Sequence, residues 1–343
     1  MIKRLSCLFA VSLTLSAFIV TGLHAAEKKY RIRVGASPVV STSGIFLAYE
    51  KGYFKEQGLD VEITIFKESG APMTVPLATG GLDVGGGNIS AGLWNAINQG
   101  QGIKLVADKG HIEKGMSYIG LVVRKDHVDS GRYKTYKDLK GFKMAVTAYG
   151  VSQQIAADKF LRVGDLQRKD ISFEKMPYVQ MNIALEKKEL DATIQLEPYL
   201  TKAVQDGIAV KVADVYEVYP DQQSAAIFYS SRFIREHRDL AEKFMVAYLK
   251  GVREYDNAFI RGIDKAKTIA LLKKYIEIES GSIWDNMIPV GLNPNGFLNK
   301  RSLTEDAAWY KKYGFIEQVP DIDKAVDESF VKKAVAAIGE YKP

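Results

Sequence analysis

The clearest structural pattern lies in residues 30–66, which read YRIRVGASPVVSTSGIFLAYEKGYFKEQGLDVEITIF. Residues 30–35 and 60–66 alternate apolar with polar side chains, as half-buried strands do. Between them, residues 45–51 fit a short amphipathic helix that ends at Gly52, because glycine readily takes the left-handed conformation found at helix ends. A strand, a helix and a second strand in this order predict a βαβ unit with parallel strands.

The same alternation continues along the chain and then stops. Further strands are expected at residues 82–84, 103–107, 119–123, 143–147, 171–173, 191–194, 209–212 and 225–229. Further helices are expected at residues 71–78, 88–98, 151–163, 178–187 and 198–206. Only helical patterns follow, at residues 239–259, 265–278, 282–288, 303–313 and 324–338. The predicted fold class is therefore α/β, with mostly parallel sheets flanked by helices.

The alternating pattern breaks and restarts, which predicts two lobes. We assign residues 121–223 to lobe 2, and residues 26–120 plus 224–343 to a discontinuous lobe 1 that includes the C-terminal helices. The chain would then cross between the lobes twice, near residues 119–124 and 220–226. No long Gly/Ser linker separates the two parts, so we expect lobes hinged closely across a ligand cleft.

The first 25 residues have the pattern of a secretory signal peptide. Lys3 and Arg4 form a positive start, residues 5–20 are apolar and uncharged, and Ala25-Ala26 suits cleavage. A membrane anchor is the alternative, but a spanning helix needs roughly 20 apolar residues, and this run is shorter. We therefore expect export to the periplasm.

Composition narrows the possible functions. The chain has 343 residues, of which 47% are hydrophobic and 26% charged, as in an ordinary globular protein of about two domains. Its formal charge of +6 falls to +4 when Lys3 and Arg4 are removed with the signal peptide. No run of five basic residues occurs, so nucleic acid is not an expected partner. Cys7, the only cysteine, lies in the signal peptide, which excludes thiol catalysis and disulfides from the mature chain.

Three expected strand-to-helix turns are rich in Gly, Ser, Thr or Asn. They are residues 41–44 (STSG), 85–90 (GGGNIS) and 149–153 (YGVSQ). Such turns lie at the carboxyl ends of parallel strands, where ligands bind, and helix N-termini attract anions and other acceptors. The alternative is that these residues only cap their helices. Because three turns in two lobes share the feature, we favour a ligand cleft. The candidate ligand-binding residues are Ser41, Thr42, Ser43, Asn88, Ser90, Tyr149, Ser152, Gln153 and Glu197.

Motifs for catalysis, nucleotide binding and metal binding are missing from the sequence. His111 follows a glycine in a polar stretch and is the one candidate acid or base for the cleft, whereas His127 and His237 lie in charged stretches typical of a surface. Glu197 precedes Pro198 at an expected helix start, so a structural role is the alternative to orienting a ligand. We expect no catalytic residue, metal or cofactor.

Several segments resemble, in order, those of periplasmic substrate-binding proteins of the nitrate/sulfonate/taurine class of ABC transporters. They are residues 45–62 (IFLAYEKGYFKEQGLDVE), 77–84 (LATGGLDV), 138–146 (DLKGFKMAV), 190–192 (LDA), 197–199 (EPY), 230–234 (SSRFI) and 237–240 (HRDL). The resemblance implies a type II periplasmic binding-protein fold with two lobes. It also implies a solute-binding subunit, not an enzyme, that captures a small anionic or polar organic solute and delivers it to an inner-membrane permease. We expect a monomer.

Two other functions remain open on the sequence alone. One is an exported enzyme on the same fold, such as a dehydratase of a small acid, and the other is a sensor that presents a ligand to a membrane receptor. The identity of the solute is open as well, because residues 37–44 contain no Arg or Lys. A cation there would have indicated a sulfonate or nitrate.

Overall fold

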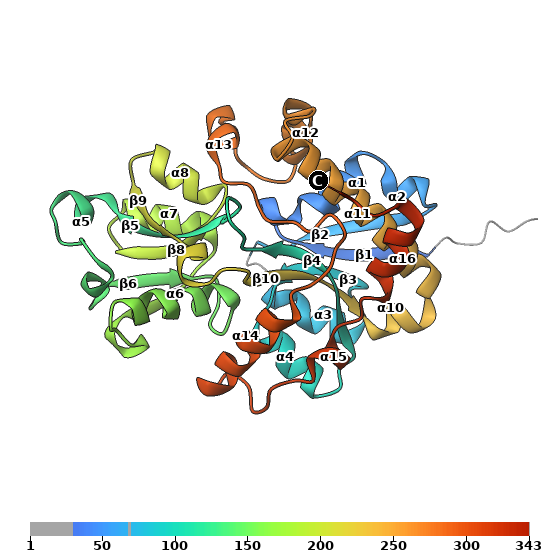
Figure 1. Cartoon of the computed structure of the whole chain (residues 1–343), viewed down its shortest axis with the longest axis horizontal. Coiled ribbons are helices and arrows are strands. Elements are labelled where there is room, and N and C mark those ends of the chain that lie inside the picture. The colour runs from blue at the N-terminus through green and yellow to red at the C-terminus, as the bar shows by residue number, and fades with distance from the viewer. Residues whose placement is uncertain (1–29, 68–69, 343) are drawn as a thin grey trace, which may run out of the picture. The chain divides into compact units, whose positions relative to one another are not determined.

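The first sheet contains the two strands expected on either side of the first helix. The computed structural model describes residues 30–67 and 70–342 (Figure 1). The strands are β1 (Arg31–Ala36), β2 (Asp60–Ile65), β3 (Val84–Asn88), β4 (Ile103–His111) and β10 (Gln223–Ser230), in the order β2-β1-β3-β10-β4. β1 is parallel to β2 and β3, whereas β10 is antiparallel to β3 and β4. The predicted βαβ unit is therefore confirmed.

The second sheet repeats this plan. It consists of β5 (Ile119–Arg124), β6 (Lys143–Val146), β7 (Ser172–Lys175), β8 (Ala192–Leu196) and β9 (Ala209–Asp214), in the order β7-β6-β8-β5-β9. β6 is parallel to β7 and β8, and β5 is antiparallel to β8 and β9. In each sheet four strands share one direction and the fifth opposes them, which confirms mostly parallel sheets.

Two short stretches connect the sheets. Residues 112–118 lead from β4 to β5, and residues 215–222 lead from β9 back to β10. In both cases the strand that follows the connection is the antiparallel one. The chain therefore forms two lobes, named here the first and second lobe after their sheets, and crosses between them twice.

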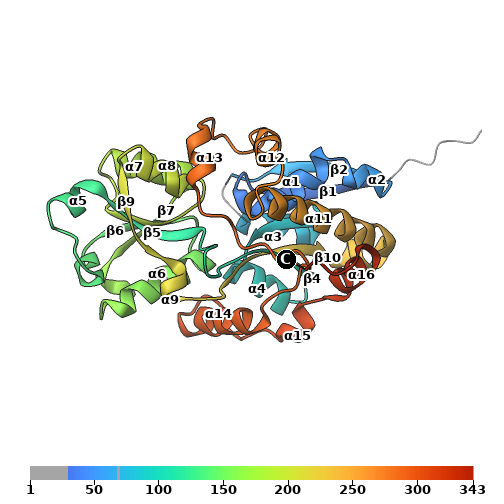
Figure 2. The ribbon, with the colours of Figure 1, turned by 45° about the horizontal axis from the view of Figure 1, so that its top comes forward.

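Helices cover both faces of each sheet (Figures 1 and 2). The first lobe carries α1 (Ser43–Glu50), α2 (Tyr53–Glu56), α3 (Thr74–Thr79), α4 (Ala91–Asn98), α10 (Ser231–Glu236), α11 (Arg238–Phe259), α12 (Lys265–Leu272), α15 (Ile322–Ala325) and α16 (Ser329–Ile338). The second lobe carries α5 (Lys125–Asp129), α6 (Ser152–Val163), α7 (Tyr178–Glu186), α8 (Tyr199–Gln205) and α9 (Val215–Val218). Short 3-10 helices are η1 (Val40–Thr42), η2 (Ala71–Met73), η3 (Tyr136–Leu139) and η4 (Arg168–Asp170). None of the helices in the described part of the chain is long and apolar enough to cross a membrane.

The glycine run at residues 85–87 lies inside β3, which corrects the expected turn. Here glycine is needed for close packing on the sheet, because a Cβ on Gly86 would lie 2.9 Å from Ile45 and 3.3 Å from the Lys109 side chain. A Cβ on Gly87 would collide with the Gly70 backbone. The actual turn is shorter, and α4 begins only at Ala91.

The C-terminal helices do not contact the first lobe alone. Helices α11, α12, α15 and α16 pack on that lobe, as expected. Helix α13 (Gly281–Asn286) instead contacts α8 of the second lobe, and α14 (Lys300–Lys312) contacts both α4 and α6. The α14 contact includes a hydrogen bond of 2.9 Å from Trp309 Nε1 to Asp158 of α6. The segment containing α13 and α14 therefore links the two lobes.

Close packing of α1 against α11 leads to a prediction about Gly251. A methyl group at this position would collide with the Gly44 carbonyl oxygen and lie 2.8 Å from Ala48 N. We expect Gly251→Ala to lower the free energy of unfolding by about 1–3 kcal/mol, the usual cost of overpacking, although alanine favours helices. Urea unfolding measures the change.

Gly281→Ala is the matched control, because Gly281 also lies in a helix but has open space around its Cβ position. It should leave stability unchanged or raise it by up to about 1 kcal/mol. Equal effects of the two substitutions would contradict the packing argument.

Candidate functional site

A cavity of about 350 Å³ lies between the lobes, at the carboxyl ends of strands from both sheets. The first lobe contributes Pro38 and Val39 from the turn after β1, and Lys67 from the segment after β2. The second lobe contributes α7 with its preceding turn and the start of α8, and the C-terminal part contributes Glu277. The second-lobe lining consists of Pro177, Tyr178, Val179, Gln180, Ile183 and Tyr199. The walls are thus mainly apolar and aromatic, as is typical of sites for small organic molecules.

Two tyrosines hold the lobes together at this interlobe cavity. Tyr178 Oη accepts a hydrogen bond of 3.2 Å from Asn88 Nδ2 at the end of β3. Tyr199 Oη donates a bond of 3.2 Å to the Pro38 carbonyl. Their rings stack with centroids 6.2 Å apart and planes 8° from parallel. Each tyrosine thus both lines the cavity and contacts the opposite lobe.

A second set of contacts joins the lobes at the start of α6. Ala91 N donates to Gly150 O at 2.7 Å, and Ser152 N donates to Ile89 O at 3.1 Å. Ser152 Oγ also donates to Ser224 O at 2.9 Å. These bonds tie the two predicted turns, residues 85–90 and 149–153, directly to each other.

The first predicted turn, residues 41–44, is fully buried. Ser41 Oγ accepts a hydrogen bond of 2.9 Å from Lys109 Nζ, and Ser43 Oγ donates to Val40 O at 2.6 Å. The Thr42 hydroxyl is buried with no hydrogen-bond partner among the described residues. Ser37 Oγ, just after β1, is also buried and has no hydrogen-bond partner among the described residues.

The remaining candidates already have partners within the protein. Ser90 caps α4 by accepting from Leu93 N at 3.2 Å. Gln153 Oε1 accepts from Thr147 N at 2.9 Å, and its amide group donates to Ile194 O. Tyr149 is 53% exposed and donates to Phe173 O at 3.0 Å. Of the predicted set, Asn88 bonds to a residue that lines the cavity, and all nine stay predictions as ligand contacts.

Glu197 is buried just before α8 and is not among the residues that line the cavity. Its carboxylate accepts bonds from Thr201 N (3.0 Å), Thr201 Oγ1 (2.9 Å) and Ile288 N (3.2 Å). Burial raises the pKa of Glu197 to about 7, although these three donors oppose the rise. Glu197 thereby connects the second lobe to the segment that follows α13.

Two histidines, His111 and His127, lie against carboxylates. His111 Nδ1 lies 3.1 Å from Asp108. Burial disfavours its charged form, but Asp108 and Glu113 outweigh burial and raise the pKa of His111 to about 10, so it is charged at neutral pH and unable to accept a proton. His127, expected at the surface, is buried and lies 2.6 Å from Asp191. In residues 30–67 and 70–342, no group of three or more His, Cys, Asp or Glu residues could hold a metal ion.

Tyr178, Tyr199 and Lys109 were not predicted as site residues from the sequence. Tyr178 begins a helix directly after β7, but its turn lacks the glycines and hydroxyls that marked the other turns. Lys109 lies beyond the apolar run at residues 103–107, where the strand was expected to end, whereas β4 continues to His111. Only their positions in the sequence could have indicated these residues. Each one follows the apolar part of a strand, at the edge of the sheet where ligands bind.

Comparisons with known proteins agree with this geometry. The sequence profile of the NMT1-like family matches residues 25–264. The fold is similar to that of the periplasmic nitrate-binding protein NrtA from Synechocystis PCC 6803, with a TM-score of 0.75, 16% identity, and coverage of 91% of this chain and 90% of that one. No curated protein is significantly similar in sequence.

Two further solved structures share the fold. The ligand-binding component of an ABC-type import system from Staphylococcus aureus, with zinc bound, has a TM-score of 0.73 and 14% identity, covering 89% of this chain and 99% of that one. The alkanesulfonate-binding protein SsuA from Xanthomonas axonopodis pv. citri, bound to MOPS, has a TM-score of 0.68 and 18% identity, covering 87% and 98%. At these identities the similarity establishes the fold, that of a two-lobe periplasmic binding protein.

The bond from Tyr199 to Pro38 predicts how the lobes respond to a substitution. Tyr199→Phe removes one hydrogen bond that exists only when the lobes meet, worth about 0.5–1.5 kcal/mol. We expect the population of open molecules to rise about two- to tenfold. Spin labels on cysteines introduced at the exposed residues Lys55 and Lys140, one in each lobe, would report a larger share of long distances.

Tyr49→Phe is the matched control, because Tyr49 is an exposed tyrosine on α1 outside the cavity lining. Its distance distribution should equal that of the parent protein. If Tyr199→Phe also left the distribution unchanged, Tyr199 would not hold the lobes together.

Glu197 predicts a dependence of stability on pH. The pKa of Glu197 is about 7 in the folded protein, above its ordinary value of 4.5. Between about pH 4.5 and pH 7 the native state therefore keeps a proton that the unfolded chain has lost. The stability from the neutral form is complete below about pH 4.5 and is lost as the pH rises through about 7. Relative to Glu197→Gln, the free energy of unfolding should fall by up to about 3 kcal/mol between acidic and mildly alkaline pH.

Urea unfolding at a series of pH values measures this difference. The exposed Glu317→Gln variant serves as the control and should show no comparable trend. A constant difference between Glu197→Gln and the parent would show that Glu197 does not titrate in this range.

Proposed function

Because the chain belongs to the NMT1-like family, we propose that it is the solute-binding subunit of an ABC importer. In this role it captures a small anionic or polar organic solute between its lobes and delivers the solute to a membrane permease. The observation that carries the proposal is the interlobe cavity, whose wall contains Tyr178 and Tyr199, each bonded to the opposite lobe. A ligand that contacts both lobes favours the closed state by its extra contacts there.

The proposed location is the periplasm. The signal-peptide pattern of residues 1–25 supports export, and these residues lie outside the described part of the chain. We assign residues 26–120 plus 224–343 to lobe 1 and residues 121–223 to lobe 2. The two sheets support this division, except that β5 begins at Ile119 and β10 begins at Gln223.

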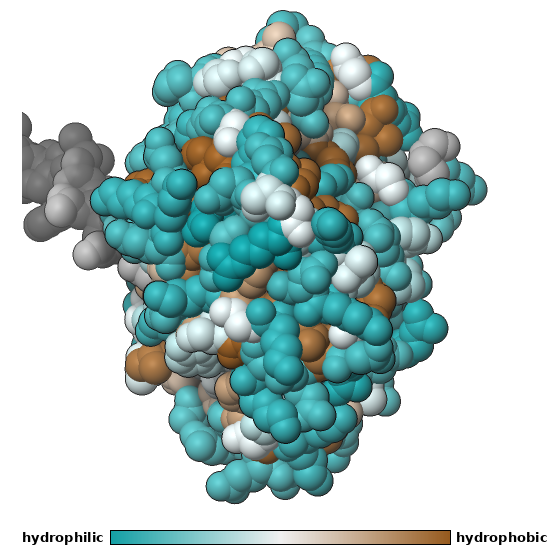
Figure 3. Space-filling view, turned by 90° about the vertical axis from the view of Figure 1, so that its left-hand side faces the viewer, coloured by the Kyte–Doolittle hydropathy of each residue, from teal (hydrophilic) through white to brown (hydrophobic). Residues whose placement is uncertain are grey.

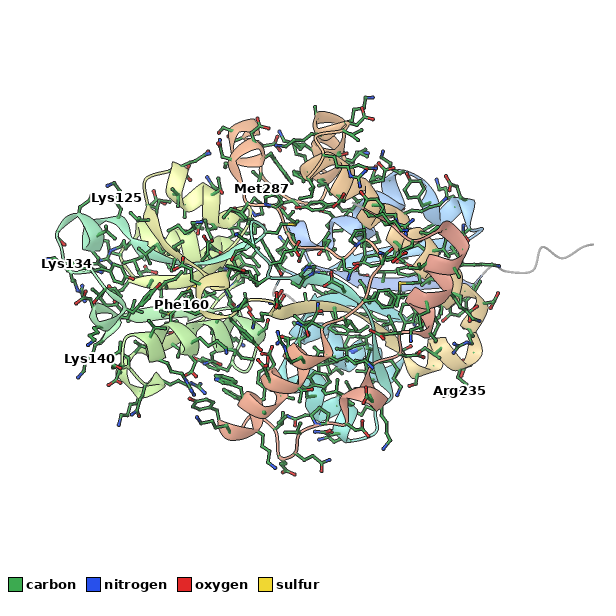
Figure 4. All side chains as sticks on the ribbon, in the orientation of Figure 1. Lys125, Lys134, Lys140, Phe160, Arg235 and Met287 are labelled. Atoms are coloured by element: carbon green, nitrogen blue, oxygen red, sulfur yellow. The ribbon has the colours of Figure 1, made fainter. Side chains whose placement is uncertain are left out.

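The proposed partner is an inner-membrane permease that docks one monomer. Figure 3 shows the end of the second lobe, where hydrophilic residues cover most of the surface and apolar ones form only small separate groups. Lys125, Lys134 and Lys140 project from the outer edge of this lobe, while Arg235 lies at the opposite end of the molecule (Figure 4).

The two titratable residues that the sequence suggested for the cleft, His111 and Glu197, give the enzyme alternative no support. His111, its candidate, is held as an ion pair with Asp108, and Glu197 is bonded to the backbone and side chain of Thr201. No observation favours the sensor alternative over transport.

A thermal-shift screen of the mature protein tests the proposed function. The probes are sulfonates, inorganic oxyanions, aromatic acids, amines and pyrimidines. A true solute at about a hundredfold excess over its Kd should stabilise the fold by about 2.7 kcal/mol and raise the melting temperature measurably. A lack of response to every class would contradict the proposal.

Two tryptophan substitutions locate the binding. Ile183→Trp should abolish the thermal shift, because Ile183 lines the cavity and is 44% exposed, so the indole can fill the space without disturbing the core. Val163→Trp, at the 57% exposed end of α6, should leave the shift intact. A shift that survives Ile183→Trp would place the solute elsewhere.

A further inference from the structure

Lys109 is a fully buried lysine on β4, the strand at one edge of the first sheet. In the pairing of β10 with β4, Ala225 lies opposite Gly110 and Ala226 lies opposite Asp108, so Lys109 is the extra residue of a β-bulge. Bulges commonly redirect a side chain beside a functional site. The Lys109 stem lies against Gly86, where any larger residue would press on it. A bulge and a glycine together accommodate this one cation.

The neighbouring carboxylate is not available to neutralise Lys109. Asp108 Oδ1 accepts bonds from Gly110 N (3.0 Å) and Gln223 Nε2 (2.6 Å). Asp108 Oδ2 contacts His111 Nδ1 (3.1 Å) and accepts from Asn293 N (2.7 Å). Both oxygens are therefore occupied, and the charge of Asp108 is already balanced by His111.

Among the described residues, Lys109 Nζ has one hydrogen-bond partner, Ser41 Oγ at 2.9 Å. No carboxylate of the described residues forms an ion pair with it. An ammonium group has three donors, so two of them lack a described protein acceptor. Burying such a charge without a counter-ion costs several kcal/mol.

Unpaired hydroxyl groups lie in the same turn. Ser37 is 3% exposed and Thr42 is 0% exposed, and neither hydroxyl has a hydrogen-bond partner among the described residues. Pro38 and Val39, between them in the sequence, line the interlobe cavity. One turn thus carries the cavity wall, two unsatisfied hydroxyls and the partner of a buried cation. Ammonium and hydroxyl donors of this kind are suited to an acceptor-rich anionic group.

We propose that Lys109 anchors the acidic group of the captured solute, and that this solute is an organic anion whose apolar part lies against Tyr178 and Tyr199. The inference rests on the proposed function and adds the class of ligand. Residues 37–44 contain no cation of their own, and Lys109 supplies one because it reaches that turn from β4. The apolar cavity wall accounts for the remainder of the solute.

The same geometry couples binding to a proton. Burial lowers the pKa of Lys109 to about 7, with Asp108 partly opposing the fall. The groups around Lys109 titrate at other pH values. Burial alone would raise the pKa of Asp108, but His111 and several hydrogen bonds outweigh burial and lower it. The pKa of His111 is about 10, and burial raises the pKa values of Tyr118 and Tyr248. A bound anion favours charged Lys109, so affinity should be highest below about pH 7 and fall as the pH rises.

Calorimetric titration of the mature protein tests the inference. The probes are benzoate, 1-hexanesulfonate and phenylphosphonate, with benzamide and 1-hexanol as neutral counterparts. The parent protein should bind at least one anion about tenfold or more tightly than the neutral probes, and more tightly at about pH 6 than at about pH 8.5. Repeating the titration in buffers of different ionisation enthalpy measures proton uptake on binding.

Lys109→Met keeps the shape of the side chain and removes the charge. It should weaken anion binding about 10- to 100-fold at acidic pH and abolish the proton uptake. Because Glu197 and Asp306 also have pKa values of about 7, uptake that disappears with Lys109 identifies the titrating group. Lys104→Met is the matched control, since Lys104 also lies on β4 but is not among the residues that line the cavity, and should change affinity less than about threefold.

Thr42→Val provides a second variant if Lys109→Met does not fold, and should weaken anion binding several-fold. Full anion affinity in Lys109→Met or Thr42→Val, or neutral probes that bind as tightly as anions, would overturn the inference while leaving a solute-binding protein. Absence of binding by every probe in this set and in the wider screen would overturn the proposed function as well.

Discussion

The backbone bonds between residues 89–91 and residues 150–152 hold the two lobes together, and the position of the cavity depends on them. They join the end of β3 to the start of α6, so these two points cannot separate without breaking buried hydrogen bonds. Tyr178 and Tyr199 meet the first lobe through side-chain bonds instead. The lobes can therefore part most easily at the tyrosines, which also line the cavity.

Much of the fold could be predicted because strand and helix periodicities are local properties of the sequence. The strands at residues 31–36 and 60–65 and the long helix at residues 238–259 lie within a residue or two of their expected positions. The glycines at residues 85–87 were misplaced, because glycine is equally suited to a turn and to a strand against which other groups pack closely. Only the positions of Ile45 and Gly70 in space distinguish these cases.

The ligand-binding residues were harder to predict than the strands and helices, because a polar residue at a strand end can have more than one role. Ser41 bonds to Lys109 and Asn88 bonds to Tyr178, and both stay predictions as ligand contacts. Ser152 and Gln153 satisfied the same argument, yet their side chains bond to Ser224 and Thr147. A polar residue at a strand end serves either a ligand or the backbone, and composition does not separate the two roles. Lys109 reaches Ser41 through a bulge, which leaves no trace in the pattern of apolar residues.

The place of β10 in the first sheet has a consequence for folding order. β10 lies between β3 and β4 and pairs Ile227 with Gly86, far apart in the sequence. The second sheet, by contrast, is built from the continuous stretch of residues 119–214. Non-local pairing is slow because loop-closure entropy must be overcome first. The second lobe can thus assemble as an autonomous local unit, whereas the first sheet remains divided between β3 and β4 until β10 arrives. On this order, Lys109 becomes enclosed only when β10 pairs with β4.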